Sequence, residues 1–435
     1  MRIRLAFSAT SLALVVFACV GADPLVGTDP IDAGALIPAD TGTTVTDAAS
    51  TVDSGGLPVD AGSDTGSIAD AGCPPTGCEK ELVATADTTR GADPDREWAE
   101  ITYGVAVDDD FVYYSTWPTI PGSGFHPWPS FWGGRVYYRD KKQLAVPPAV
   151  LEETAPDDIA KDLARSDGGL PPDGPAYRTA SMPSFLARVG DRIMWSTWYS
   201  NGGIRSRSVS LSGLGPLVEE LSCTDTCSFF RTATDGKNAY VVQFDRAIYA
   251  VEPGTDAGVR TLTKNEVVDG SFTEPQLRGV FATNGRVYYS TRTALRSVPI
   301  EGGSPTTHFA LQPGTPQYDN ALFDSITIAK RWLYYADRES FGGMVSRLDL
   351  QDPSKGPVKI DTNLGSTQTV LVDGDTLYVV GYDAGVVYAF DLSRPGFPRT
   401  SYVTGLKHPR DITVDATHLY IAGGDDAKIY RVPKR

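Results

Sequence analysis

The chain has 435 residues, and 39 Lys and Arg against 54 Asp and Glu give it a formal net charge of −15. Hydrophobic residues make up 41% of the chain, enough for a sizeable core, so the chain as a whole is not expected to be disordered. The acid excess argues against a nucleic-acid partner, because proteins that bind nucleic acid present basic faces. Four histidines leave little material for a histidine-rich metal site.

The first residues have the layout of an export signal. Two arginines precede an apolar run over residues 5–18, which is too short to span a bilayer but suits a secretory signal. The run ends in Val16-Phe17-Ala18-Cys19, which resembles the lipobox of bacterial lipoproteins. The resemblance implies that residues 1–19 form a lipoprotein-type signal peptide and that Cys19 is lipidated. Soluble export, with cleavage after Ala22, is the alternative.

The residue after Cys19 bears on the choice of membrane. By the same resemblance, an aspartate there would favour retention in the inner membrane, and this chain has Val20. We therefore expect an outer-membrane lipoprotein that faces the periplasm or the cell surface. No second apolar run reaches transmembrane length, so the lipid would be the only contact with the membrane.

Four further cysteines remain: Cys73, Cys78, Cys223 and Cys227. An even number in an exported chain predicts two disulfides. Local pairing, which joins the first two and the last two, is the simplest of the three possible connectivities. The alternative is a zinc site built from the two pairs, and export favours the disulfides.

Residues 20–78 are expected to form a disordered, acidic tether. Up to residue 72 this stretch contains no Lys, Arg, Glu, His or aromatic residue, and nine aspartates give it a charge of −9. Such a composition cannot bury enough apolar area to offset the entropy of the chain. Its Asp-Ala-Gly repeats lack the closely spaced carboxylates and the terminal Glu of a calcium-binding EF-hand loop.

An internal repeat begins after residue 79. Its most regular feature is a strand with an apolar and aromatic pair, whose second members are Tyr113, Met194, Tyr240, Tyr288, Tyr334, Tyr378 and Tyr420. The steps between them are 81, 46, 48, 46, 44 and 42 residues. Four short strands per period, rich in Val, Tyr and Gly turns, are typical of propeller blades. We predict an all-β fold with a seven-bladed β-propeller over residues 79–435, and six or eight blades are the alternatives.

The long first step is attributed to insertions at 118–132 and 154–183, because both stretches read as loops, and a concealed eighth blade is the alternative. The last copy stops after its third strand. Closing the ring then needs an outer strand from elsewhere, and residues 81–85 are well placed to supply it.

Two copies resemble known propeller repeats. Leu333-Tyr-Tyr-Ala-Asp337 resembles the YWTD repeat of low-density-lipoprotein-receptor-type propellers. Val414-Asp415 before Leu419-Tyr420 is similar to both YWTD and NHL repeats. The similarity runs from about Ala106 to the C-terminus, and it implies a fold far more than a function.

The candidate binding residues lie on one face. Loops that join second to third strands, and one blade to the next, share a face of a propeller, and both insertions are loops of these kinds. Residues four positions beyond the aligned aromatics should form the rim of that face. Together with the aromatic insertion, they give the predicted ligand-binding set: Trp117, His126, Trp128, Trp132, Trp198, Arg292, Arg338 and Tyr382. Trp and Arg suit sugar rings or protein anchors, and the alternatives are packing between blades for Trp and ion pairs for Arg.

No catalytic constellation is visible in the sequence. The innermost strands offer one column without a carboxylate: Ala106, Ala187, Ala233, Phe281, Thr327, Leu371 and Thr413. Aspartates recur two positions later, where they are expected to cap turns: Asp108, Asp235, Asp373 and Asp415. We predict no metal site, no catalytic residues and no cofactor, with a structural calcium ion at residues 108–110 as the alternative.

These features together predict an exported, membrane-tethered propeller. We expect a monomer that binds a protein or a carbohydrate on its loop face without catalysis. The alternative is a hydrolase or lyase, with or without a metal ion, that acts at the top of the central channel.

Overall fold

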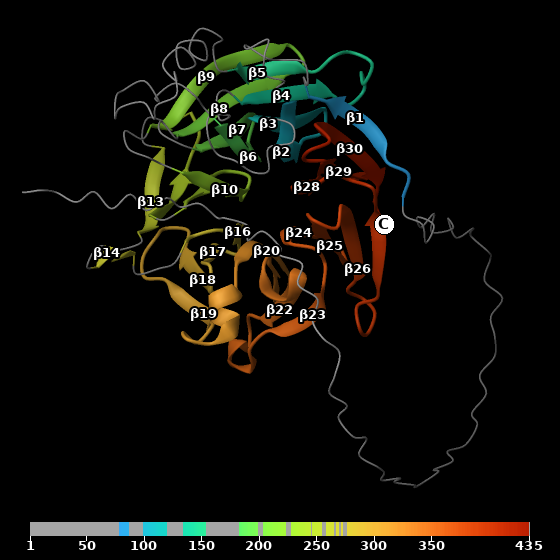
Figure 1. Cartoon of the computed structure of the whole chain (residues 1–435). Coiled ribbons are helices and arrows are strands. Elements are labelled where there is room, and N and C mark those ends of the chain that lie inside the picture. The colour runs from blue at the N-terminus through green and yellow to red at the C-terminus, as the bar shows by residue number, and fades with distance from the viewer. Residues whose placement is uncertain are drawn as a thin grey trace, which may run out of the picture. The chain divides into compact units, whose positions relative to one another are not determined.

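The computed structural model describes residues 78–86, 99–119, 134–153, 182–198, 203–222, 228–244, 246–254, 258–264, 267–268, 271–272 and 276–434. All of them lie in one compact unit, Ser67–Arg435. In this unit seven four-stranded antiparallel sheets follow one another around a ring (Figure 1), which confirms the predicted seven-bladed β-propeller. The predicted signal peptide with Cys19, and residues 20–77 of the predicted tether, lie outside the described residues.

In the first three blades the chain steps outward from the ring axis, strand by strand. The first blade consists of β2 (Ala99–Val107), β3 (Phe111–Thr119), β4 (Arg135–Asp140) and β5 (Ala149–Glu153). The second consists of β6 (Met182–Val189), β7 (Arg192–Trp198), β8 (Gly203–Ser210) and β9 (Gly213–Ser222). The third consists of β10 (Phe229–Thr234), β11 (Ala239–Gln243), β12 (Ala247–Val251) and β13 (Val259–Lys264).

The next three blades repeat this order. The fourth consists of β16 (Val280–Thr283), β17 (Arg286–Ser290), β18 (Ala294–Pro299) and β19 (Thr306–Ala310). The fifth consists of β20 (Phe323–Ala329), β21 (Trp332–Asp337), β22 (Met344–Asp349) and β23 (Val358–Thr362). The sixth consists of β24 (Thr367–Asp373), β25 (Thr376–Gly381), β26 (Val386–Asp391) and β27 (Arg399–Val403).

The seventh blade closes the ring with a strand from the other end of the described chain. Its inner strands are β28 (Asp411–Val414), β29 (His418–Ala422) and β30 (Lys428–Pro433). The outermost strand is β1 (Glu81–Thr85), which runs antiparallel to β30 and lies beside it in Figure 1. The Glu81 carboxylate also accepts hydrogen bonds of 2.7 and 2.9 Å from Arg431. The predicted ring closure is confirmed.

Side-chain packing between neighbouring blades forms the core. Seven hydrophobic clusters of the described residues each join two adjacent blades, including the first and the last. Serine hydroxyls on second strands add hydrogen bonds to backbone carbonyls of the next blade, from Ser115 to Ser184 (2.5 Å), from Ser196 to Phe230 (3.2 Å) and from Ser290 to Phe323 (2.6 Å). An eighth cluster joins residues of the first three blades, and Trp117 belongs to it.

The strand register confirms the repeat that was read from the sequence. Each aligned residue of a second strand lies opposite the predicted inner-column residue of its own blade: Tyr113 and Ala106, Met194 and Ala187, Tyr240 and Ala233, Tyr288 and Phe281, Tyr334 and Thr327, Tyr378 and Leu371, Tyr420 and Thr413. The first and second strands therefore pair at equivalent positions in all seven blades.

Recurring aspartates cap the turns between first and second strands. In Asp108, Asp235 and Asp415 one carboxylate oxygen accepts backbone N–H groups of the turn, and the other accepts the hydroxyl of the tyrosine five residues later. Asp373 instead forms an ion pair of 2.6 Å with Lys434. The predicted turn role is confirmed for the first three.

The two faces of the ring differ in their loops. We call the face on which the seven innermost strands begin the entry face, and the opposite one, with the turns between first and second strands, the turn face. The connections between β3 and β4 and between β5 and β6, which contain the two predicted insertions, leave from the entry face. Near this face the register shifts by a bulge in β2, β6, β10, β20 and β24.

A few short elements were not anticipated. They are α2 (Pro316–Asn320), η2 (Ser340–Gly342), η3 (Pro353–Lys355) and the hairpin of β14 (Val267–Val268) with β15 (Ser271–Phe272). The α2 turn begins at Thr315, whose hydroxyl accepts the backbone N–H of Tyr318. In the part of the chain that the structure describes, no helix has the length and apolar character to span a membrane.

Candidate functional site

Polar and aromatic side chains meet where the innermost strands begin. We call this group the channel mouth, and it consists of Tyr103 (β2), Phe185 (β6), Phe230 and Arg231 (β10), Arg278 (before β16), Asp324 (β20), Gln368 and Thr369 (β24), Arg410 (before β28) and Asp411 (β28). Every blade contributes at least one residue. The group therefore lies on the entry side of the ring axis.

Arg231 crosses the axis from the third blade to the sixth. Its guanidinium donates to the Gln368 carbonyl at 2.7 Å and to the Thr369 hydroxyl at 3.1 Å. It also lies 4.0 Å from the centre of the Phe185 ring. The nearest carboxylates, Asp324 and Asp411, are farther away, at 3.9 and 3.8 Å. One side chain of the third blade thus lies within 4 Å of residues or rings of four other blades at the centre of the ring.

Arg278 and Asp324 form the closest ion pair of the channel mouth. The Arg278 guanidinium donates to Asp324 at 3.0 Å and to the side-chain carbonyl of Gln276 at 2.8 Å. Burial lowers the pKa of Arg278, while the Asp324 carboxylate acts in the opposite direction. Asp324 is therefore paired mainly with Arg278.

Asp411 is the other buried carboxylate. It accepts the backbone N–H of Val105 at 3.1 Å and, at 3.5 Å, the hydroxyl of Thr369. Burial raises the pKa of Asp411 to about 6, although Arg231 and these hydrogen bonds act to lower it. The carboxyl therefore changes its charge in a range where ordinary aspartates stay ionised.

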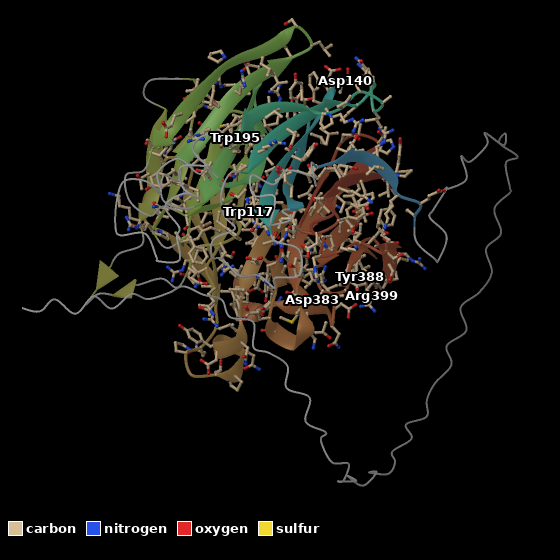
Figure 2. All side chains as sticks on the ribbon, turned by 45° about the horizontal axis from the view of Figure 1, so that its top comes forward. Trp117, Asp140, Trp195, Asp383, Tyr388 and Arg399 are labelled. Carbon is tan, nitrogen blue, oxygen red and sulfur yellow. The ribbon has the colours of Figure 1, made fainter. Side chains whose placement is uncertain are left out.

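The aromatic members stack in the mouth. Tyr103 packs face to face on Trp117, with ring centres 3.8 Å apart, and the indole N–H of Trp117 donates to the Pro183 carbonyl at 2.6 Å. Trp117 is only 4% exposed, and Figure 2 shows it toward the middle of the ring. This environment is the packing alternative weighed for the tryptophans, so a ligand role for Trp117 stays a prediction.

Three other predicted residues of the rim are described. Arg338 and Tyr382 are half-buried beside the mouth. The Tyr382 hydroxyl accepts a hydrogen bond of 3.2 Å from Arg410, and its ring stacks on His408 with centres 4.6 Å apart. Arg292 instead donates to the Ala321 and Asp319 carbonyls at 3.0 and 2.8 Å, so it ties down the segment around α2.

The remaining predicted site residues lie outside the description. These are His126, Trp128, Trp132 and the side chain of Trp198, together with Cys19, Cys73, Cys223 and Cys227. The fourth cysteine, Cys78, donates its backbone N–H to the Tyr402 carbonyl at 2.7 Å, next to the ring closure. Both disulfide pairings stay predictions.

The sequence reading missed the charged members of the mouth. Arg231 and Asp411 stand two positions before the inner-column residues of their blades, and Arg278, Asp324 and Arg410 stand three positions before. The sequence-based prediction used the inner column and the positions after it, whereas these residues precede it, and in β10 and β20 the register shifts there by a bulge. The column three residues ahead of the first contains Arg278, Asp324 and Arg410, but not Arg231 or Asp411.

Metal ligation finds little support in the described residues. They contain no group of three or more His, Cys, Asp or Glu side chains placed to hold a metal ion. At the turn considered for calcium, Asp108 accepts backbone N–H groups and Asp110 pairs with Lys142 at 2.9 Å.

Hollows on the turn face are less suited to binding. One, of about 460 Å³, lies between the turns at Asn284, Lys330 and Gln351, and a smaller one of about 100 Å³ adjoins Trp332. The first is open to solvent, and charged groups around the two hollows are paired with one another. Lys330 lies 3.0 Å from Asp375, and Arg331 lies 3.0 Å from Asp349. We therefore place the candidate site at the channel mouth.

Comparison with known proteins supports the fold only. No family model and no curated protein matches the sequence. A chain of the mitotic checkpoint complex has a TM-score of 0.52 at 8% identity, over 86% of this chain and 99% of that one. A streptogramin B lyase has a TM-score of 0.51 at 11% identity, over 81% and 96%. At these identities the likeness shows the propeller and no shared activity.

A weaker likeness is to a chain of a nidogen–laminin complex. It has 16% identity and a TM-score of 0.40, over 60% of this chain and 86% of that one. This score is too low to support an argument about this chain.

Proposed function

We propose that the protein is an exported, membrane-tethered β-propeller that binds a protein or glycan partner on its entry face without catalysis. The observation that supports the proposal is that the long connections and two half-buried side chains lie at the same face. Both long connections leave from it, and beside the channel mouth Arg338 and Tyr382 are half-buried and reachable from solvent. Half-buried arginine and tyrosine are typical anchors of binding surfaces.

The buried carboxylates already accept hydrogen bonds from neighbouring residues, which supports binding over catalysis. A hydrolase or lyase at the top of the channel would need a poised acid or base, and Asp411, with its pKa raised to about 6, is a candidate for this role. However, Asp411 accepts hydrogen bonds from Val105 and Thr369 and faces Arg231. These contacts give it a structural role, so the enzyme stays the second candidate.

Binding can be tested with the full-length chain on arrays of envelope polysaccharides and fractionated envelope proteins. We expect Trp128→Ala and Trp132→Ala to abolish binding while the melting temperature stays within about 2 °C of the parent, because both side chains are proposed to contact the ligand and not to pack in the fold. Lys330→Ala on the turn face is the control and should bind normally. Loss of melting temperature in both Trp variants would indicate packing, and release of a cleaved product from any arrayed glycan would favour the hydrolase or lyase.

Anchoring is proposed from the sequence around Cys19. The full-length chain should be recovered with the outer membrane and should incorporate a labelled fatty acid, because two or more acyl chains anchor a protein stably. Cys19→Ser is expected to abolish the label and to move the protein out of the membrane fraction. Unlabelled protein in the soluble exported fraction of the parent strain would contradict the anchor and leave the binding proposal standing.

A further inference from the structure

The smaller hollow of the turn face contains one arginine without a carboxylate partner. This hollow, of about 100 Å³, lies between the fifth and sixth blades, and Ala329, Tyr334 and Arg347 belong to its lining. No described carboxylate forms an ion pair with the Arg347 guanidinium, and its buried Nε has no hydrogen-bond partner. Asp375 also lines the hollow, but its carboxylate is paired with Lys330 at 3.0 Å. The charge of Arg347 is therefore not balanced by a neighbouring acid.

Aromatic groups surround this guanidinium instead. Its central carbon lies 3.9 Å from the centre of the Trp332 ring and 4.4 Å from that of Phe397. Burial raises the pKa of Tyr334, while Arg347 acts in the opposite direction through its charge and through a hydrogen bond to the tyrosine hydroxyl. These groups hold the half-buried arginine in place but do not neutralise it. A charge in a partly desolvated position attracts an opposite charge more strongly than the same charge in open water.

The seventh blade contains the same arrangement with a carboxylate added. Arg431 lies opposite Tyr420 in the strand pairing. Arg347 lies opposite Tyr334 in the same way. On its other side Arg431 lies opposite Glu81 of the outermost strand, whose carboxylate accepts two hydrogen bonds from it, of 2.7 and 2.9 Å. Such a bidentate pair is among the strongest contacts that a guanidinium makes, so the seventh blade shows which group completes the arrangement.

The fifth blade lacks both acids that the seventh blade places here. At the position of Glu81 its outermost strand has Val358, which lies opposite Arg347 and is 51% exposed. The second acid of the seventh blade is Asp415, which accepts the hydroxyl of the tyrosine five residues later. Five residues before its own tyrosine the fifth blade has Ala329, which lines the hollow. The hollow thus opens beside an arginine and a tyrosine whose acidic partners are missing.

We infer that this hollow binds a carboxylate, and that the carboxylate belongs to a small organic acid. The carboxylate accepts hydrogen bonds from Arg347, as the glutamate of the seventh blade does from its arginine. The space suits an acid of a few carbon atoms, since one water molecule already takes about 10–15 Å³ of such a volume. Trp332 and Leu392 offer apolar contacts to these carbon atoms. The site lies on the turn face, so it goes beyond the binding proposed for the entry face and does not depend on it.

The test measures binding of propionate to the full-length chain by isothermal titration calorimetry at low ionic strength. Propionate reproduces the side chain of a glutamate, and propionamide is its neutral counterpart. We expect propionate to bind and propionamide not to bind. Arg347→Gln should weaken the binding of propionate at least about tenfold, which corresponds to the loss of a hydrogen bond between charged groups.

A second pair of variants tests the site without removing the arginine. Val358→Glu introduces a carboxylate opposite Arg347, as in the seventh blade, and should abolish the binding of propionate. Val358→Gln has the same size without the charge, so it is the matched control and should bind propionate as the parent does. Because Val358 is exposed, neither change is expected to disturb the fold.

Several outcomes would overturn the inference. They are no binding of propionate by the parent, equal binding of propionamide, or full binding of propionate by both Arg347→Gln and Val358→Glu. A blocked tripeptide with glutamate between two glycines distinguishes the source of the carboxylate. If it binds more tightly than propionate, the assignment to a small acid is wrong and the site takes an acidic side chain of a protein. A failure of this kind leaves the proposed function standing, because none of these variants lies on the entry face.

Discussion

Replacing Val83 by Asp in the full-length chain is expected to lower the free energy of unfolding by about 4 kcal/mol, since it removes a buried aliphatic side chain and buries an unpaired charge. Val83 lies in β1, is 1% exposed and packs in the cluster that joins the last blade to the first. The matched control is Leu82→Asp, one position earlier in the same strand, where the side chain is 48% exposed. That change should alter the free energy by less than about 0.5 kcal/mol.

Urea unfolding followed by circular dichroism checks this result. A loss of 4 kcal/mol is large beside the total stability of about 5–15 kcal/mol that is usual for a protein domain. Detachment of β1 would also leave β30 as an open sheet edge, so Val83→Asp should aggregate at concentrations where Leu82→Asp stays monomeric. Equal urea midpoints for the two variants would show that the ring does not depend on its N-terminal strand.

The ring closure and the blade count could be predicted because they follow from strand alternation and spacing. Tyr113, Tyr240 and Tyr420 each follow a turn aspartate by five residues, and this local hydrogen bond fixes the frame of the blade. A register error of one residue would move every side chain of a strand to the other face of its sheet. The aspartate and tyrosine spacing therefore indicates which residues of each of these blades face the same side. The last copy of the repeat lacks a fourth strand, and residues 81–85 were the predicted strand available to complete that blade.

The channel mouth could not be predicted in the same way, because its geometry is not periodic. The bulges in β10 and β20 shift the pairing by local backbone changes that leave no clear mark in the sequence. The partners of Arg231 are also distant: Gln368 and Thr369 follow it by 137 and 138 residues and belong to a blade across the ring. Such a contact depends on the three-dimensional closure of the ring, which alternation along a strand does not encode.

Arg231→Met is expected to lower the free energy of unfolding by about 3 kcal/mol at pH 8, because breaking a buried ion pair leaves the other charge without compensation. That charge is Asp411, whose carboxylate lies 3.8 Å from Arg231. The other neighbouring carboxylate, Asp324, keeps its hydrogen bond to Arg278 and should be affected less. Methionine retains much of the volume of the arginine stem, so the loss reports mainly on charge.

The pH dependence of this loss separates charge from packing. The pKa of Asp411 is raised to about 6 from its ordinary 3.8, so the folded state binds this proton more tightly than the unfolded state does. The contribution of Asp411 to stability is therefore complete below about pH 4 and falls as the pH rises through 6. Arg231 lowers the pKa of Asp411, so its removal raises that pKa further and deepens the loss at high pH.

The difference between the parent and Arg231→Met should accordingly be clearly smaller at pH 5, where the variant carries Asp411 as a neutral acid, than at pH 8. Urea unfolding at both pH values measures it. The double variant Arg231→Met with Asp411→Asn removes both charges, so it should be more stable than Arg231→Met alone at pH 8 and should lose this dependence on pH. A loss of the same size at pH 5 and pH 8 would mean that Arg231 stabilises the ring through its hydrogen bonds to Gln368 and Thr369 and its contact with Phe185, rather than through the charge of Asp411.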